Sequence, residues 1–413
     1  MRIWLVNPFD PLPGDPEQEG RYASLARAVV GRGHGLTWWT SNFSHRFKRP
    51  VDQASISTAC QEAGIDVRFL DAPPYRRNVG AARLRSHAIL ARRFAQEAAS
   101  STERPDVVLV SSPPPNLALR AVEYARAHGA KSLVDVQDAW PDAFSCLAPV
   151  WLRPALSGVI WAMRRTVRRT AAACDGIIGV ADAYVDSFFK ETDGHALRAT
   201  IPLGIDLGVF DTAVRAGQCE QFTKPPGHVW LAYTGSLNRN YDCLTILHAA
   251  ARLGDRLGDH IRFFLTSRGE LAEQAQQIVR ENKLTNVTLT GFLEFEPWAY
   301  LLSQCDVGFN ASFPETMIFL PNKVFYYMAG GVVVLNTIPG QCSQIVREGG
   351  CGLDYEAGNV ESCAQAIERM VRDRAARTAM QQASRRLAET RFDRALLSPQ
   401  YAELIERVGA GEA

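Results

Sequence analysis

The sequence predicts an α/β protein built from two doubly wound domains. Short apolar runs alternate with helical patterns twice along the 413 residues. A junction rich in Pro and Gly, 201–206, separates the two series, and the chain is long enough for two domains of ordinary size. We expect residues 1–203, joined by a C-terminal helix at 391–413, to form the first domain and residues 204–390 the second.

Each element of the first domain follows from the period of its apolar residues. A strand-like run leads into a long polar loop, and the helix after it places Tyr22, Leu25 and Val29 near helical spacing. The triple proline after Ser112 ends another strand. The expected strands are 3–7, 36–40, 67–70, 106–111, 131–136 and 177–180, and the expected helices are 21–32, 79–99 and 117–128.

The second domain repeats the alternation after a segment, 211–227, that is expected to be loose chain. The expected strands are 229–234, 262–266, 287–290, 307–310 and 332–335, with helices between them and one final helix at 391–408. Ligands of doubly wound sheets bind at the carboxyl ends of the strands. With two such domains, the expected site is the cleft between them.

The composition fits a globular protein and gives no bulk signal for nucleic acid. The chain is 46% hydrophobic and 22% charged, with a net charge of +1. The charge is uneven, because residues 1–200 carry 25 Lys and Arg against 20 Asp and Glu, whereas the remainder carries 20 against 24. A basic first half suits anionic partners such as phospholipid headgroups or pyrophosphates, and chance asymmetry is the equal alternative.

The cysteines and the apolar runs predict a cytoplasmic protein with reduced thiols. The nine cysteines are odd in number, and no two fall at Cys-x-x-Cys spacing. The N-terminus lacks a long apolar signal core, and no run reaches the roughly 18 apolar residues that cross a bilayer. A peripheral position on the inner face of the membrane is compatible with these features.

The segment 151–170 is the candidate for such a membrane contact. Trp151, Leu152, Leu156 and further apolar residues fall near helical spacing, and four arginines cluster at its end. A basic amphipathic helix with Trp is typical of a membrane-surface element. An ordinary core-packing helix with a solvated arginine face explains the same pattern.

Lys323 lies at the start of a helical pattern that follows a strand and ends in paired glycines. A helix N-terminus with a nearby cation suits an anionic ligand. Arg239, just after the Gly235 turn, and Arg268 follow two other strand ends of the same domain. Together these cations are placed to grip a diphosphate, and an ordinary surface position is the alternative for either arginine.

The first domain offers carboxylates at one strand end. Asp138 follows the strand 131–136, and Asp142 lies just beyond a Trp-Pro turn. We interpret either aspartate as a sugar-hydroxyl ligand or a catalytic base, and a helix N-cap is the equal alternative. Asp135, three residues before Asp138, faces the opposite side of an extended strand, so the two are not an acid/base pair.

Three further residues are candidate ligands of the site, and each has an ordinary structural explanation as the alternative. Gly20 begins a helix where a phosphate can reach backbone N–H groups, or it belongs to a plain connecting loop. His45 follows the second strand and can face the cleft, although a lone histidine is more often structural. Glu315 precedes Lys323 in its loop and is either a ligand of a ribose or sugar hydroxyl or a solvated side chain.

Taken in order, these segments resemble a GT-B glycosyltransferase of family 4, the "glycosyl transferases group 1" type used in bacterial surface-polysaccharide assembly. The segment 20–35 is similar to the family's first helix, and 135–142 to a D-x-W-P variant of a later segment. The junction 201–206 with Phe210 resembles the interdomain signature, 233–235 the start of the second domain, and 321–335 the donor motif.

The resemblance implies two Rossmann-like domains facing across a cleft, with the C-terminal helix crossing back to the first. It implies a retaining transfer from a UDP- or GDP-linked sugar to a lipid-linked or polysaccharide acceptor, with no cofactor and no essential metal. Asp138 would be catalytic, and His45 and Asp142 would lie on the acceptor side. The donor-binding residues would be Gly20, Gly235, Arg239, Arg268, Glu315, Asn322 and Lys323, whose positive charges would stabilise the leaving diphosphate.

Several positions depart from the family pattern: Ile318 and Tyr326 where relatives often carry two glutamates, Leu203 in the hinge motif and Val333 after Gly331. Tyr326 stands where relatives carry a ribose-binding glutamate, so Glu315 is the candidate to supply that carboxylate. The departures leave two other hypotheses open. One is a catalytically weakened GT-B protein that binds an active transferase, and the other is a nucleotide-sugar epimerase.

Overall fold

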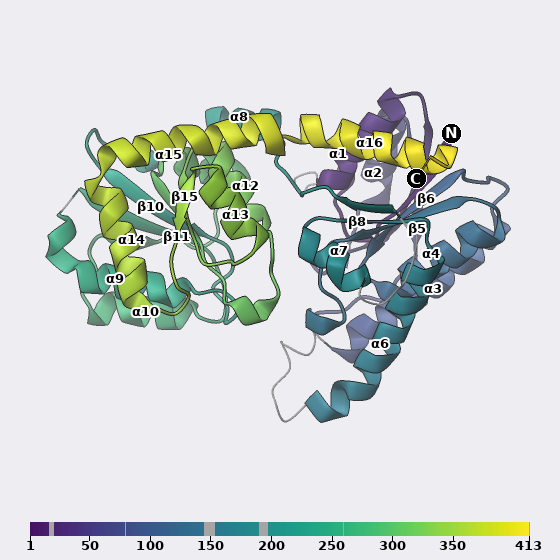
Figure 1. Cartoon of the computed structure of the whole chain (residues 1–413), viewed down its shortest axis with the longest axis horizontal. Coiled ribbons are helices and arrows are strands. Elements are labelled where there is room, and N and C mark those ends of the chain that lie inside the picture. Colours follow the sequence, from purple (N-terminus) through teal and green to yellow (C-terminus); the bar gives the residue numbers. More distant parts are fainter. Residues whose placement is uncertain (16–19, 79, 144–152, 190–196, 259, 413) are drawn as a thin grey trace. The chain divides into compact units, whose positions relative to one another are not determined.

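The computed structural model describes residues 1–15, 20–78, 80–143, 153–189, 197–258 and 260–412. The chain forms two compact units, Met1–Leu203 with Ala395–Ala413, and Gly204–Arg394 (Figure 1). Each unit contains a sheet of parallel strands with helices around it, which confirms the predicted α/β class. No helix of the described residues is both long and apolar enough to span a membrane.

The N-terminal unit contains a seven-stranded sheet in the order β5-β2-β1-β6-β7-β8-β9, with parallel pairing throughout. These strands are β1 (Arg2–Val6), β2 (Gly35–Ser41), β5 (Ile65–Leu70), β6 (Val107–Ser112), β7 (Lys131–Val136), β8 (Gly176–Gly179) and β9 (Leu197–Thr200). A small hairpin, β3 (Phe43–Ser44) with β4 (Arg49–Pro50), follows β2. The strand order reverses between β1 and β6, and ligands of such sheets bind at this switch point.

Seven helices of the described residues belong to this unit: α1 (Arg21–Gly31), α2 (Gln53–Glu62), α3 (Ala81–Ser100), α4 (Pro115–Ala127), α6 (Arg153–Ala173), α7 (Asp182–Phe189) and α16 (Arg394–Ala410). Helix α4 packs against both α3 and α6. The C-terminal helix α16 belongs here because Tyr401, Ile405 and Val408 join the buried core of the unit.

The C-terminal unit contains a six-stranded sheet in the order β12-β11-β10-β13-β14-β15, again parallel. Its strands are β10 (Val229–Thr234), β11 (Ile261–Thr266), β12 (Val287–Leu289), β13 (Val307–Asn310), β14 (Val333–Asn336) and β15 (Gly352–Asp354). Its helices are α8 (Leu207–Ala216), α9 (Cys243–Leu253), α10 (Ala272–Glu281), α11 (Phe295–Gln304), α12 (Asn322–Ala329), α13 (Gln341–Glu348), α14 (Val360–Arg372) and α15 (Arg374–Leu387). Here the strand order reverses between β10 and β13.

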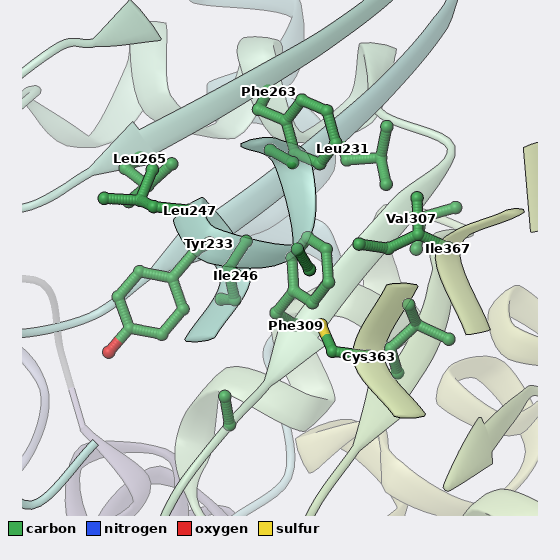
Figure 2. Packing of buried hydrophobic residues seen from close by; sticks show 14 of the residues in the cluster. Leu231, Tyr233, Ile246, Leu247, Phe263, Leu265, Val307, Phe309, Cys363 and Ile367 are labelled. Carbon is green, nitrogen blue, oxygen red and sulfur yellow. The ribbon is translucent and has the colours of Figure 1, made fainter. Parts of the chain in front are cut away.

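The core of the C-terminal unit joins its sheet to α9 and α14. Tyr233, Phe263 and Phe309 of the sheet are almost completely buried, and Ile246 and Cys363 pack against them from the helices (Figure 2). The eight described cysteines are free thiols, and seven of them are buried. The ninth, Cys146, lies outside the described residues.

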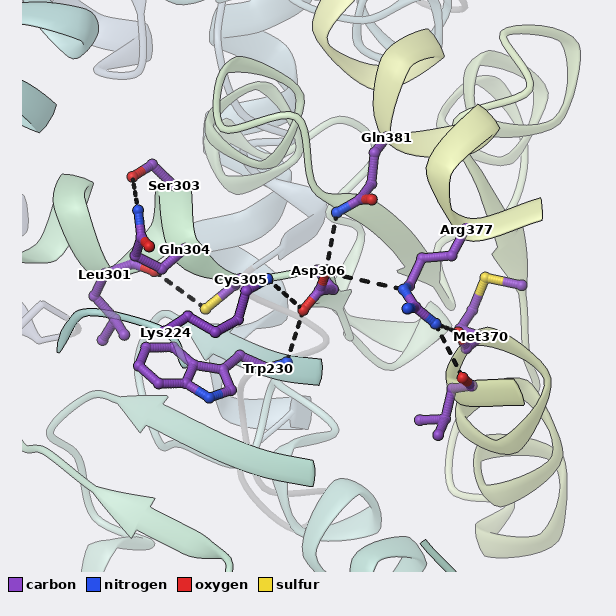
Figure 3. Close-up of polar contacts among 11 residues, drawn as sticks. Lys224, Trp230, Leu301, Ser303, Gln304, Cys305, Asp306, Met370, Arg377 and Gln381 are labelled. Atoms are coloured by element: carbon purple, nitrogen blue, oxygen red, sulfur yellow. Dashed lines mark hydrogen bonds and ion pairs between the residues drawn. The ribbon is translucent and has the colours of Figure 1, made fainter. Parts of the chain in front are cut away.

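Asp306, at the start of β13, holds several segments of this unit together (Figure 3). Its carboxylate pairs with Lys224 at 2.8 Å and accepts the backbone N–H of Trp230 at 2.8 Å. Arg377 and Gln381 approach it from α15 at 3.9 Å and 3.3 Å. A nearly buried carboxylate with two basic partners is compensated, so it fixes α15 against the amino ends of the central strands β10 and β13.

Three sequence-based expectations about elements were wrong. The segment expected to be loose, 211–227, begins inside α8, which Asp206 caps by accepting the backbone N–H of Val209 at 2.9 Å. The first domain has a further short strand, β9, whose partly exposed residues gave no apolar run. The final helix, expected to begin at 391, begins at Arg394 because a π-helical turn, Ala388–Phe392, precedes it, and it continues to Ala410.

Candidate functional site

The candidate donor site lies at the switch point of the C-terminal sheet. Strand β10 ends at Thr234, and Gly235 follows in an extended turn with φ of 133°. A Cβ at Gly235 would lie 3.0 Å from Nζ of Lys323, the second residue of α12. Strands β10 and β13 are neighbours at this switch point. The segments that follow them carry Gly235 and Lys323, so the fold brings the two residues together although they are far apart in the sequence.

Lys323 has no ion-pair partner among the described residues of this unit. Its Nζ is buried and has no hydrogen-bond partner within the described part of the chain. The ammonium lies over the rings of Tyr241 and Tyr233, at 3.9 Å and 4.9 Å from their centroids. Burial lowers the pKa of Lys323 to about 7, and the nearby Cys243 opposes the shift. An anionic ligand would restore the charge that burial disfavours.

The other donor candidates lie at the surface of the same unit. Asn322 is the exposed first residue of α12, where backbone N–H groups have no helical partner. Glu315 is exposed in a short 3₁₀ helix, Pro314–Thr316. The loop then passes through Met317, which adopts a left-handed φ of 56°, a conformation that side chains adopt only when the surrounding structure holds it.

The two strand-end arginines do not converge with Lys323. Arg239 is 84% exposed, and its guanidinium lies 3.7 Å from the carboxylate of Glu270. Arg268 is exposed and stacks over the ring of Phe292 at 5.3 Å. Both side chains follow the carboxyl ends of neighbouring strands, β10 and β11. Arg239 lines a pocket of about 340 Å³ with Tyr241, whose ring contacts the Lys323 ammonium.

Tyr326 faces an aromatic cluster. Its ring lies 4.9 Å from that of Trp298 and 6.4 Å from those of Phe295 and Phe210. The phenyl body therefore packs between α12, α11 and α8. Tyr326 therefore packs as an aromatic residue at the position where the resemblance implies a carboxylate. The carboxylate closest in sequence to α12 is the exposed Glu315.

In the N-terminal unit, Asp138 and Asp135 have separate environments. Asp135 is fully buried, accepts the Tyr22 hydroxyl at 2.6 Å and lies 3.4 Å from Arg21. Asp138, past the end of β7, accepts the backbone N–H of Ala139 at 2.8 Å, and its burial raises the pKa of its carboxyl. Asp135 lies within β7 and contacts α1, whereas Asp138 lies in the loop beyond the strand, so the two carboxylates have different partners.

His45 lies in the turn of the β3–β4 hairpin. Its Nδ1 is 2.7 Å from the Tyr75 hydroxyl and 3.1 Å from Nζ of Lys48. Burial, with Arg83 and Lys48 nearby, lowers the pKa of His45 to about 4, so the ring is neutral at physiological pH. A neutral imidazole here can accept a hydrogen bond from a ligand or from its neighbours.

Sequence reasoning missed Arg83 and His87 as site residues. Nε of Arg83 lies 3.3 Å from Nε2 of His87, one helical turn further along α3. The Arg83 guanidinium stacks on the Trp140 ring at 4.7 Å, and Asp138 is one of the charges that act on it. The available signal was an arginine and a histidine four residues apart in the first turns of a helix. We call His45, Lys48, Tyr75, Arg83 and His87 the basic cluster.

Asp142 and Gly20 have partners within the N-terminal unit. Asp142 pairs with Arg164 of α6 at 2.7 Å. A Cβ at Gly20 would lie 2.7 Å from the Asp10 carboxylate, which accepts the backbone N–H of Tyr22 at 3.2 Å. The anion at the start of α1 is thus the carboxylate of Asp10. Its closeness explains why residue 20 is a glycine, since a Cβ there would collide with it. Trp151, of the candidate membrane segment, lies outside the described residues.

Comparison with known proteins places this geometry in a family. Residues 19–204 match the family model described as "Glycosyl transferase 4-like domain", and residues 228–373 match "Glycosyl transferases group 1". A comparison with curated protein sequences found no match.

Solved structures share the fold of the whole chain. HepE from Anabaena, in complex with UDP, has a TM-score of 0.69 at 16% identity, covering 98% of this chain and 100% of that one. Sucrose-phosphate synthase from Thermosynechococcus elongatus has a TM-score of 0.72 at 16% identity and covers 99% of both chains. WaaG, a glycosyltransferase involved in lipopolysaccharide biosynthesis, has a TM-score of 0.67 at 14% identity over 98% and 99%. The chain therefore belongs to the glycosyltransferases of the GT-B fold, with a 4-like domain followed by a group 1 domain.

Proposed function

We propose that this glycosyltransferase moves a sugar, with retention of the anomeric configuration, from a UDP-linked donor to a lipid-linked acceptor in cell-surface glycan assembly. The observation that carries the proposal is the buried ammonium of Lys323, which has no hydrogen-bond partner in the described chain. It stands at a sheet switch point, in the unit matched by the group 1 family model. We favour UDP as the nucleotide of the donor because HepE binds it.

In this proposal Lys323 supplies charge to the leaving diphosphate. When the bond between the anomeric carbon and the phosphate oxygen breaks, negative charge develops on the diphosphate, and a fixed cation in a dry site lowers the barrier. The backbone N–H groups at the start of α12 add to this stabilisation. With these groups in place, we propose that turnover requires no metal ion.

In the N-terminal unit we propose that Asp138 binds a hydroxyl of the reacting sugar and acts as the catalytic carboxylate. Its burial, beside Arg83, supports this role, because a shielded carboxylate makes stronger hydrogen bonds than a solvated one. His45 is proposed to contact the acceptor through its neutral ring. The basic character of α6 supports a peripheral position at the cytoplasmic face of the membrane.

The test is a transfer assay with radiolabelled UDP- and GDP-sugars and a membrane extract as the source of acceptor. We expect label to enter the lipid fraction from a UDP-sugar, with an α-configured linkage from an α-configured donor. Folded protein that transfers no sugar from any donor, while a known transferase is active in the same extract, would count against the proposal.

A second candidate function is a binding role beside an active transferase. It is favoured by Tyr326, whose ring packs in an aromatic cluster where relatives have a ribose-binding carboxylate. Thermal-shift measurements with UDP and UDP-glucose separate the two functions. A rise in Tm with either nucleotide supports a donor site, and no shift with any nucleotide supports the binding role.

A further inference from the structure

Within the described residues, the cations of the basic cluster have no carboxylate at ion-pair distance. Lys48 and Arg83 have no acidic partner within salt-bridge distance in the described residues, and each disfavours the protonation of His45. Burial, together with the charge of Arg83, lowers the pKa of Lys48 to about 8. Asp138 acts on Arg83 only at longer range. Placing like charges together in a half-buried position is unfavourable, and an anionic ligand between them would stabilise the charged forms.

Aromatic rings hold these cations in fixed positions. The ammonium of Lys48 lies 4.9 Å from the centroid of Tyr75, and the guanidinium of Arg83 lies 4.7 Å from that of Trp140. The hydroxyl of Tyr75 is also bonded to His45. Lys48 reaches this place from a backbone with a left-handed φ of 56°, a conformation uncommon for lysine. The donors of the cluster are therefore preorganised.

A groove lies beside the basic cluster and shares His87 with it. His87 and Trp140, which contact Arg83, also line a pocket of about 360 Å³ with residues of α4 and α6 such as Pro115 and Met163. A second pocket of about 690 Å³ continues from it, because both are lined by Asn116 and Thr166.

The groove follows one face of α3. Its α3 residues recur at helical spacing: Leu84, His87, Ala88, Ala91, Arg92, Ala95, Gln96 and Ala99. At 1.5 Å per residue this stripe runs for roughly 22 Å. Four alanines leave room along it, and the lining is mainly apolar, with arginines at two positions. The neighbouring α6 exposes Trp161 and Val159, at 61% and 41%.

We propose that the acceptor is an amphiphile whose phosphate binds between Lys48 and Arg83 and whose single apolar chain lies in the groove along α3, α4 and α6. This inference rests on the proposed transferase function and names the chemistry of its acceptor. Charge complementarity selects the occupant, because a cationic end continuous with an apolar channel matches a phosphate joined to a hydrocarbon chain. An inorganic phosphate would use the cluster alone, and a partner helix would use the groove alone.

The test is calorimetric titration of the full-length protein with dodecyl phosphate below its micelle concentration, beside dodecanol and inorganic phosphate. We expect dodecyl phosphate to bind at least tenfold more tightly than either. Arg83→Gln should weaken it at least tenfold, and Ala88→Trp should do the same by filling the groove. Ala127→Trp, at an exposed position outside the groove, is the matched control and should leave binding unchanged.

Three outcomes would overturn the inference. Binding of dodecyl phosphate no tighter than that of inorganic phosphate would leave a simple anion site. Equal binding of dodecanol would remove the role of the cluster. Tight binding of an acidic amphipathic peptide, with none of dodecyl phosphate, would assign the groove to a partner helix. UDP-glucose is titrated in parallel: if it binds and dodecyl phosphate does not, the acceptor inference alone fails, whereas the reverse result removes the donor site of the proposed function.

Discussion

Nζ of Lys323 lies 3.0 Å from the place that a Cβ of residue 235 would occupy, and Gly235 leaves that place empty. The two residues come from opposite sides of a sheet switch point. The ammonium rests on the rings of Tyr241 and Tyr233 and has no acceptor within the described residues. Glycine at 235 therefore leaves room beside a buried cation, and a helix N-terminus with such a cation suits an anion.

Lys323→Ala should lower kcat/KM for donor transfer at least about tenfold. A contact between charged groups contributes about 1.5–3 kcal/mol, and about 1.4 kcal/mol corresponds to tenfold in rate. Steady-state kinetics with the identified donor measure it. Arg280→Ala removes an exposed charge of α10 in the same unit and should leave kinetics unchanged. Wild-type kinetics in the Lys323 variant would remove the phosphate role assigned to this residue.

Donor binding should weaken as pH rises above 7. The free ammonium has a pKa of about 7 because burial disfavours the charge, and a bound diphosphate raises that pKa. Below pH 7 Lys323 is charged in both states, so affinity is constant. Above pH 7 the free protein has lost the proton and must regain it on binding, so Kd for UDP-glucose should rise by up to about tenfold per pH unit. The slope should vanish in Lys323→Ala, and a flat wild-type profile between pH 7 and 9 would contradict the assignment.

Gly235→Ala should abolish most donor binding. The added Cβ would press on the Lys323 ammonium, and the φ of 133° is one that alanine rarely adopts. We expect Kd for UDP-glucose to rise at least about tenfold in calorimetry. Gly227→Ala is the matched control: Gly227 also has a positive φ, 78°, but a Cβ there meets nothing within 4 Å. If both variants bind UDP-glucose equally well, the closeness of residue 235 to Lys323 does not affect donor binding.

Asp135→Asn and Asp138→Asn should separate stability from activity. Asp135 is the buried partner of Arg21 and Tyr22, and removing one charge of a buried pair costs about 3–5 kcal/mol. Denaturant unfolding should show that loss. Asp138→Asn should change the free energy of unfolding by less than about 1 kcal/mol and lower kcat at least about tenfold. The reverse pattern would make Asp138 structural and reopen the choice of catalytic carboxylate.

Turnover should be insensitive to removal of divalent metal ions. In the proposed mechanism the charge of the leaving diphosphate is met by Lys323 and the start of α12, so EDTA should leave the initial rate within about twofold. Adding Mg²⁺ or Mn²⁺ back is the control. If EDTA abolishes activity and Mn²⁺ restores it, the charge of Lys323 alone does not stabilise the leaving diphosphate.

Local pattern determined the architecture and part of the donor site. Alternating apolar runs gave two parallel sheets, and the position of Lys323 after β13 could be read from the order of elements, because strand and helix periods are local properties of the chain. The start of α8 was missed, although its cap, Asp206, stood in the sequence. Arg239 and Arg268 were placed at the correct strand ends, but side-chain direction there depends on neighbours such as Glu270 and Phe292.

Tertiary structure alone decided which side chains meet. The basic cluster draws on the hairpin after β2, the loop after β5 and the start of α3, and strand order brings these segments to one edge of the sheet. The same order puts Asp10 at the start of α1, where the sequence suggested a phosphate. Tyr326 fills an aromatic cluster built from α8, α11 and α12. Convergence of distant segments follows from sheet topology and packing, which no local period encodes, so the sequence determined the elements and the fold determined the sites.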